Sequence, residues 1–176
     1  MRQKFPGLHK RGRDISLESM AKISKSFKNI LLCGQMGDPI YHPKFIDLLK
    51  ISKNNNVTIF TAGQGKSLEW WEEVGFISGT HEWVFGLDGL PNQSPAYRIG
   101  QNGYKVFEVM KHLSYLGIKV YWKYIVFKYN QNSIQEARHL ARDNNITFLL
   151  TESSRWDTPY DKYKPDKFYQ TRPDVS

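Results

Sequence analysis

Short apolar segments alternate with segments of helical periodicity along this chain, and that alternation restricts the possible folds more than any other feature. The apolar segments are rich in β-branched and aromatic residues, and they span residues 29–34, 57–63, 81–89, 118–130 and 146–152. Segments with apolar residues at helical spacing span residues 15–29, 42–56, 67–76, 103–117 and 133–145. Strands that alternate with helices form right-handed βαβ units and a parallel sheet, and near-continuous apolar strands indicate that both sheet faces are covered. We therefore expect an α/β fold with parallel strands, arranged as a barrel or an open sheet of about five βα units.

The helical segments carry recognisable boundary residues. Ser16, Ser67 and Ser133 each precede a helical pattern, and we expect them to be N-caps because a serine hydroxyl accepts a hydrogen bond from the first helical turn. Gly75 and Gly117 follow helical patterns, and we expect them to end those helices because glycine tolerates the left-handed conformation common there.

One domain accounts for most of the 176 residues. The α/β pattern predicts a domain over residues 1–152, followed by a polar and aromatic extension over residues 153–176 that folds back or is disordered. No apolar run is long enough to span a membrane, and the basic N-terminus lacks the apolar segment of a signal peptide. These features, and a single cysteine that suits a reducing compartment, lead us to expect a cytoplasmic protein.

The formal net charge of +8 suggests either an acidic partner, nucleic acid included, or a solvated basic surface. Lysines and arginines are spread along the whole chain, so we favour the solvated surface. The single cysteine, Cys33, excludes an internal disulfide and a metal site built from several cysteines. It lies in a strand pattern, which predicts a small apolar core residue. The five histidines show no ligand pairing, so no metal site is predicted, and we expect them at the surface or partly packed.

Small and polar residues follow the apolar segments, at the positions where a parallel α/β sheet binds ligands. Asp38 and Asp88 could accept hydrogen bonds from an ammonium group or ribose hydroxyls, and Arg98 could hold a carboxylate. Any one of these could be an ordinary turn residue. Several together favour a polar, zwitterionic or nucleoside-like ligand. No catalytic triad or phosphate-binding loop is present, and no catalytic residue can be assigned.

The ordered strand ends resemble the radical S-adenosylmethionine superfamily. "CGQMGDPIYHPKFIDLLKIS" is similar to that family's "GGEP" segment, "TIFTAGQG" lies where the family has "STNG", and "WVFGLDGL" followed by "YRIGQNGYKVFEVMKHL" is similar to "SIDG" and "YRxG". "WKYIVFKYNQNSIQEARHLA" matches a further family segment, so the resemblance extends over residues 29–151. It implies a partial (β/α) barrel and bound S-adenosylmethionine.

The resemblance also implies a set of cofactor-binding residues. Asp38 would hold the amino group of S-adenosylmethionine, residues 61–63 and Arg98 its methionine end, and Asn130 its ribose, while Asp88 would line the same mouth. The full set is Gly34, Gly37, Asp38, Pro39, Thr61, Gly63, Asp88, Arg98 and Asn130. Gly86 replaces the serine usual in the family, which removes one ligand contact.

The family's CxxxCxxC motif, which binds a [4Fe–4S] cluster, is absent from this sequence. We therefore expect the cluster only in a full-length form, and we expect the chain as given to be inactive. Truncation of a longer protein is the preferred explanation, because loss of the first strand would expose a sheet edge. The alternatives are a naturally shortened, non-catalytic S-adenosylmethionine-binding module and a basic nucleic-acid-binding α/β protein. Expected partners are a small-molecule or peptide substrate, a reductant protein, or a complementing N-terminal segment.

Overall fold

The computed structural model describes residues 14–34, 37–153, 156, 161–167 and 169. Five strands alternate with helices: α1 (Leu17–Ser26), β1 (Asn29–Cys33), α2 (Phe45–Ile51), β2 (Asn56–Thr61), α3 (Leu68–Ser78), β3 (Glu82–Gly86), α4 (Gly103–Tyr115), β4 (Lys119–Ile125), α5 (Ile134–Asp143) and β5 (Thr147–Thr151). Short 3-10 helices follow three of the strands: η2 (Pro39–Tyr41), η3 (Ser94–Ala96) and η4 (Gln131–Ser133). None of the described helices is long and apolar enough to cross a membrane.

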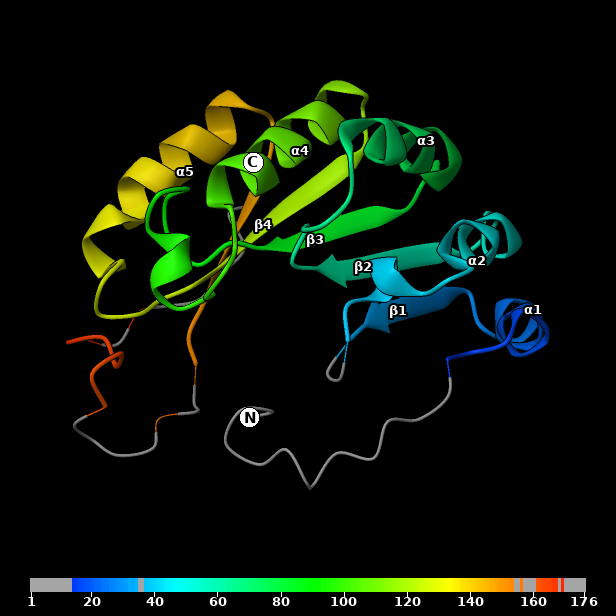
Figure 1. Ribbon diagram of the computed structural model, residues 1–176, viewed down its shortest axis with the longest axis horizontal. Coiled ribbons are helices and arrows are strands. Elements are labelled where there is room, and N and C mark those ends of the chain that lie inside the picture. Colours follow the sequence, from blue (N-terminus) through cyan, green and yellow to red (C-terminus); the bar gives the residue numbers. More distant parts are fainter. Residues whose placement is uncertain (1–13, 35–36, 154–155, 157–160, 168, 170–176) are drawn as a thin grey trace.

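The strands form one parallel sheet in the order β1-β2-β3-β4-β5. Each strand pairs with its neighbours in the sequence, the strand order of a (β/α) barrel. The sheet curves beneath the helices (Figure 1). The predicted α/β class and the partial (β/α) barrel are confirmed.

The helices pack on one face of this sheet (Figure 1), and the core lies between the two layers. Alternate strand residues point towards the helices; on β3 these are Trp83 and Phe85, which are fully buried. Trp71 of α3 packs on both, with ring centroids 5.2 and 5.5 Å away. The second face of the curved sheet turns inward, as in a barrel, and carries no helix of the described residues (Figure 1).

The structure confirms some of the predicted helix boundaries. The side chains of Ser16 and Ser67 accept hydrogen bonds from the first turns of α1 and α3, as predicted. Ser133 precedes α5, but its hydroxyl makes no capping bond and instead accepts from Gln93 Nε2 at 2.8 Å. Gly117, with φ of 79°, follows the last turn of α4 as predicted.

Three other predictions are corrected by the packing. Gly75 lies inside α3, because a hydrogen atom in place of a side chain lets this helix approach Leu113 and Leu116 of the α4 segment. β4 ends at Ile125, where the chain leaves the ladder for a turn that includes Asn130. His81 is buried rather than surface-exposed, and burial lowers its pKa.

Cys33 is also placed differently from the prediction. It is the last residue of β1 and is exposed, not a core residue. The alternation of the strand explains the difference: Ile30 points to the helices, and residues of the opposite parity, Leu31 and Cys33, lie on the other face.

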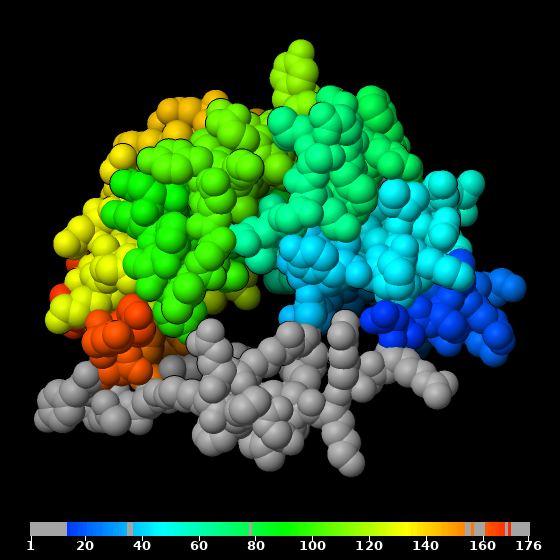
Figure 2. Space-filling model, in the orientation of Figure 1, coloured from blue at the N-terminus to red at the C-terminus, as the bar shows by residue number. Residues whose placement is uncertain are grey.

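The described part of the C-terminal extension lies against the turn that follows β4. Lys128 N donates to Tyr163 O at 2.9 Å, and the Lys128 ammonium pairs with Asp166 at 3.0 Å. The ring of Tyr163 packs edge-on to Tyr97 and Phe127. These contacts fold the described residues back onto the domain, and the space-filling view shows them beside the lower edge of the helical layer (Figure 2).

Candidate functional site

Asp38 joins the loop after β1 to the end of β2. Its Oδ2 accepts hydrogen bonds from Thr61 Oγ1 at 2.8 Å and from Ala62 N at 2.6 Å. Its Oδ1 accepts from Ile40 N at 3.3 Å, which starts the 3-10 helix η2. A carboxylate has about four acceptor positions, so these three bonds leave room for one more donor. The order Gly37, Asp38, Pro39 thus fixes a carboxylate at the carboxyl end of the sheet.

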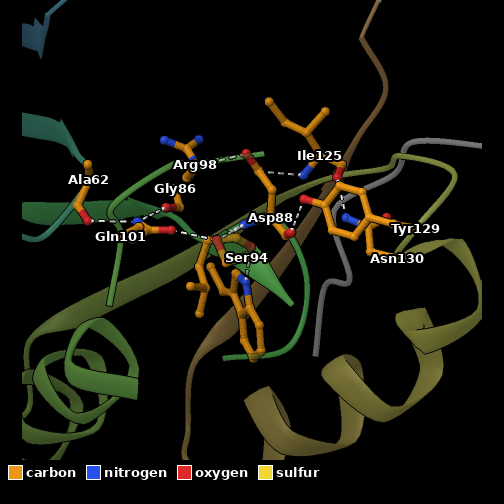
Figure 3. A network of polar contacts seen from close by, with 11 residues as sticks. Ala62, Gly86, Asp88, Ser94, Arg98, Gln101, Ile125, Tyr129 and Asn130 are labelled. Carbon is orange, nitrogen blue, oxygen red and sulfur yellow. Dashed lines mark hydrogen bonds and ion pairs between the residues drawn. The ribbon is translucent and has the colours of Figure 1, made fainter. Parts of the chain in front are cut away.

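Asp88 and Arg98 form a second polar group, in the segment between β3 and α4 (Figure 3). Asp88 Oδ2 accepts from Arg98 Nε at 2.7 Å, and Oδ1 accepts from Ile125 N at 3.1 Å. The Asp88 side chain is 0% exposed, whereas that of Arg98 is 29% exposed. Burial raises the pKa of Asp88, and the charge of Arg98 opposes that rise. The charge of Arg98 thus stabilises the ionised form of Asp88 against the cost of burial.

Asn130 is fully buried in the turn after β4. Its Oδ1 accepts from Phe127 N at 2.8 Å, and its Nδ2 donates to Ile125 O at 3.0 Å. Both ends of the amide are thus used inside the turn. The neighbouring Tyr129 hydroxyl donates to Asp88 O at 2.6 Å, so this turn also holds the Asp88 segment in place. The predicted ribose contact of Asn130 stays a prediction.

Sequence reasoning missed Gln101, which connects the two polar groups. Its buried Nε2 donates to Ala62 O and to Gly86 O, each at 3.0 Å, and thereby ties the end of β2 to the end of β3 (Figure 3). Its Oε1 accepts from Ser94 Oγ, and this hydroxyl also accepts from Asp88 N at 3.1 Å. Gln101 stands in a stretch, "GQNG", that has the composition of an ordinary turn, so no local signal marks it.

We expect Gln101→Met to destabilise the fold without changing the packed volume greatly. The substitution removes two hydrogen bonds to strand-end carbonyls, and buried acceptors left unpaired should lower the free energy of unfolding by about 2 kcal/mol. Urea unfolding followed by tryptophan fluorescence measures the change. Gln135→Met, at an exposed position of α5, is the matched control and should change it by less than about 0.5 kcal/mol. Equal effects of the two substitutions would contradict the role of Gln101.

Most of the predicted site residues come together at the carboxyl end of the sheet. Asp38 and Thr61 are in direct contact, Gly63 N donates to Thr61 Oγ1 at 2.9 Å, and Asp88 and Arg98 are paired. The remaining predicted residues lie around them: Gly34 and Gly37 in the loop after β1, Pro39 at the start of η2, and Asn130 in the turn after β4. The described residues contain no group of three or more His, Cys, Asp or Glu side chains that could hold a metal ion.

A shallow hollow lies elsewhere, near the carboxyl ends of α4 and α5. Tyr115, Asp143 and Asn145 are among its lining residues. It adjoins the amino end of the sheet, where β4 and β5 begin. Ligands of parallel α/β sheets bind at the opposite end, so the polar groups around Asp38 and Arg98 are the better candidate site.

Several solved structures share this fold. SuiB of Streptococcus suis, solved with bound S-adenosylmethionine, has a TM-score of 0.74 and 19% identity over 90% of this chain and 39% of SuiB. anSMEcpe with bound S-adenosylmethionine has a TM-score of 0.61 and 14% identity, over 85% of this chain and 46% of the other. TYW1 with a lysine–pyruvate adduct has a TM-score of 0.53 and 14% identity, over 82% and 54% of the two chains.

The chain thus spans about two fifths of the length of SuiB. No protein-family model and no curated protein sequence matches it. Two of these three proteins were solved with bound S-adenosylmethionine, and at these identities the likeness establishes the fold alone. This chain therefore has the fold that SuiB, anSMEcpe and TYW1 share with it, a partial (β/α) barrel.

Proposed function

We propose that this chain binds S-adenosylmethionine at the carboxyl ends of β1 to β4, as the cofactor-binding part of a radical enzyme. The observation that carries the proposal is the presence of two fixed, opposite charges at the carboxyl end of the sheet: the Asp38 carboxylate, bonded to Thr61 and Ala62, and the Arg98 guanidinium, bonded to Asp88. The methionine end of S-adenosylmethionine carries an ammonium group and a carboxylate, so its binding needs a negative and a positive partner. The structures of SuiB and anSMEcpe with bound S-adenosylmethionine support the choice of ligand.

The residues present fit the ligand at both ends. Asp38 retains one acceptor position for an ammonium group after its three internal hydrogen bonds. Arg98 uses only Nε on Asp88; among the described residues, its Nη groups have no hydrogen-bond partner, and they can donate to a carboxylate. When bound, S-adenosylmethionine would supply the radical chemistry of the family. The chain's own residues would orient it: Asp38 and Arg98 hold its charged end, and the Thr61–Gly63 turn offers a close backbone approach.

A [4Fe–4S] cluster would need ligands from outside these residues, because the sequence contains one cysteine and such clusters are held by several thiolates. We therefore propose that the chain alone binds the cofactor without catalysing a reaction. The same binding site would serve the second candidate, a non-catalytic S-adenosylmethionine-binding module. SuiB has also been solved with its precursor peptide SuiA, and we extend a peptide substrate to this chain as part of the proposal.

Titration calorimetry with S-adenosylmethionine tests the proposed function. We expect saturable binding to the wild-type chain, weakened at least about tenfold by Asp38→Asn, because one charge-assisted hydrogen bond is lost. Asp47→Asn, on the surface helix α2 and outside the candidate site, is the matched control and should leave the affinity unchanged. No heat and no thermal shift at millimolar ligand would overturn the proposal.

A further inference from the structure

The C-terminal extension packs on two loops that lead to the candidate site. The first loop is the turn after β4, which contains Asn130, and the second is the segment between β3 and α4, which carries Asp88 and Arg98. The described residues 161–167 of the extension lie beside the first of these loops (Figure 1). A segment outside the βα units is therefore in a position to influence the site.

Polar contacts anchor the extension to the turn after β4. The Gln131 side chain makes two hydrogen bonds with Asp166: its Nε2 donates to Asp166 Oδ2 at 2.5 Å, and its Oε1 accepts from Asp166 N at 2.9 Å. The Lys128 ammonium pairs with the other carboxylate oxygen of Asp166 at 3.0 Å. Lys128 N also donates to Tyr163 O at 2.9 Å. Together these contacts fix the backbone of Tyr163 on the turn.

The ring of Tyr163 contacts aromatic side chains of both loops. Its centroid lies 5.4 Å from that of Tyr97 in the second loop, and 6.2 and 6.4 Å from those of Phe127 and Tyr129 in the first. All three pairs have the edge-to-face geometry that aromatic rings favour. Tyr97 and Phe127 also pack on each other, with centroids 4.2 Å apart. Tyr163 thus joins the two loops through one aromatic cluster.

Two members of this cluster adjoin the candidate site. Tyr97 immediately precedes Arg98 in the chain. The Tyr129 hydroxyl donates to Asp88 O at 2.6 Å, and Asp88 Oδ2 accepts from Arg98 Nε at 2.7 Å (Figure 3). Tyr97 is 48% exposed even in this arrangement, so the loss of one ring partner would leave its segment loosely held. The position of Arg98 therefore depends in part on a ring of the extension.

We propose that the C-terminal extension is a positioning element of the cofactor site, in which Tyr163 holds the two loops in the arrangement that binds S-adenosylmethionine. Tyr163 is a positioning residue that acts through Tyr97 and Tyr129. This inference rests on the proposed function and goes beyond it, because it makes binding depend on a segment outside the βα units. The physical reason is preorganisation: a site that adopts its binding arrangement for only a fraction of the time loses affinity by that fraction.

Titration calorimetry with S-adenosylmethionine tests the proposal. Tyr163→Ala should weaken binding about tenfold, which corresponds to a binding arrangement populated about one tenth of the time. Tyr163→Phe keeps the ring and should bind within about twofold of the wild type. Tyr115→Ala is the matched control, because Tyr115 is 89% exposed and lines the hollow at the opposite end of the sheet. It should leave the affinity unchanged.

A double-mutant cycle separates positioning from a general loss of stability. Tyr97→Ala should also weaken binding, and combining it with Tyr163→Ala should weaken binding by less than the product of the two single effects, because the two rings act through one contact. Circular dichroism melting curves show which variants are folded at the temperature of the titration. If Tyr163→Ala is not folded, Asp166→Ala removes an exposed anchor of the extension instead and should weaken binding about threefold.

The outcomes distinguish this inference from the proposed function. If the wild-type chain binds S-adenosylmethionine and the folded Tyr163→Ala variant binds it equally well, the inference is overturned while the proposed function stands. Tyr163→Phe binding as weakly as Tyr163→Ala would also overturn it, since the hydroxyl rather than the ring contacts would then matter. Single effects that multiply in the double variant contradict action through Tyr97. If the wild-type chain does not bind S-adenosylmethionine, the proposed function itself fails, and this inference fails with it.

Discussion

Arg98→Met should lower the free energy of unfolding by about 3 kcal/mol at neutral pH, because it leaves the Asp88 carboxylate buried without its counter-charge. Asp88 is fully buried, and its remaining side-chain hydrogen bond among the described residues comes from Ile125 N. Methionine fills much of the volume of the arginine side chain, so the decrease in the free energy of unfolding reports the missing charge rather than a change in packing. Urea unfolding of the variant and the wild type gives the difference directly.

The loss caused by Arg98→Met should depend on pH with a definite sign. Burial already raises the pKa of Asp88, and the charge of Arg98 opposes this rise, so removing Arg98 raises the pKa further. A carboxyl whose folded pKa is raised favours the folded state at low pH and loses that contribution as the pH rises through the folded value. The deficit of the variant should therefore be greatest above the raised pKa and shrink as the pH falls towards the ordinary aspartate value of about 4.

Arg142→Met is the control for this pair of experiments, since its side chain on α5 is 73% exposed. It should change the unfolding free energy by less than about 0.5 kcal/mol at any pH. Asp88→Asn in the Arg98→Met background should recover part of the stability at neutral pH, because it removes the unpaired charge. A deficit independent of pH would contradict the assignment of the loss to the Asp88 carboxylate.

The strands and their order could be predicted from the sequence because each strand is a largely apolar run preceded by a segment of helical periodicity. The first run, at residues 29–34, became β1 within one residue of the predicted bounds. The last residue of that strand, Cys33, shows the limit of the same reasoning. Which face of the sheet a residue occupies depends on whether helices cover that face, and an isolated strand pattern does not contain this information.

Helix boundaries that depend on contacts between distant segments could not be predicted from the sequence either. Gly75 has the local context of a helix end, but its lack of a side chain serves a close approach to Leu113 and Leu116. In the site, the carboxylate of Asp38 and the guanidinium of Arg98 could be identified by charge and position in the strand ends. Gln101 could not, because its function is to join carbonyl groups of β2 and β3 that only the folded sheet brings together.

Gly63→Ala should strongly destabilise the fold, because the substitution combines backbone strain with steric overlap. Gly63 has a φ of 69°, and a Cβ atom there would lie 2.8 Å from Phe85 Cδ1 and 3.2 Å from Val106 Cγ1. The left-handed backbone costs about 1 kcal/mol for alanine, and forcing a methyl group into a packed core costs about 2 kcal/mol more. The free energy of unfolding should therefore fall by about 3 kcal/mol, as measured by urea denaturation.

Another glycine of the chain separates the two contributions to that loss. Gly100 has a φ of 81°, and a Cβ atom there would meet no atom of the described residues within 4 Å beyond its chain neighbours. Gly100→Ala therefore isolates backbone strain and should cost about 1 kcal/mol. Phe85→Leu added to Gly63→Ala should make the pair less damaging than the sum of the single changes, because the smaller side chain gives the new methyl group room. Strict additivity of that pair would contradict steric overlap with Phe85 as the cause. In that case the left-handed backbone conformation alone would have to explain the glycine at position 63, where the chain leaves β2 at the candidate binding site.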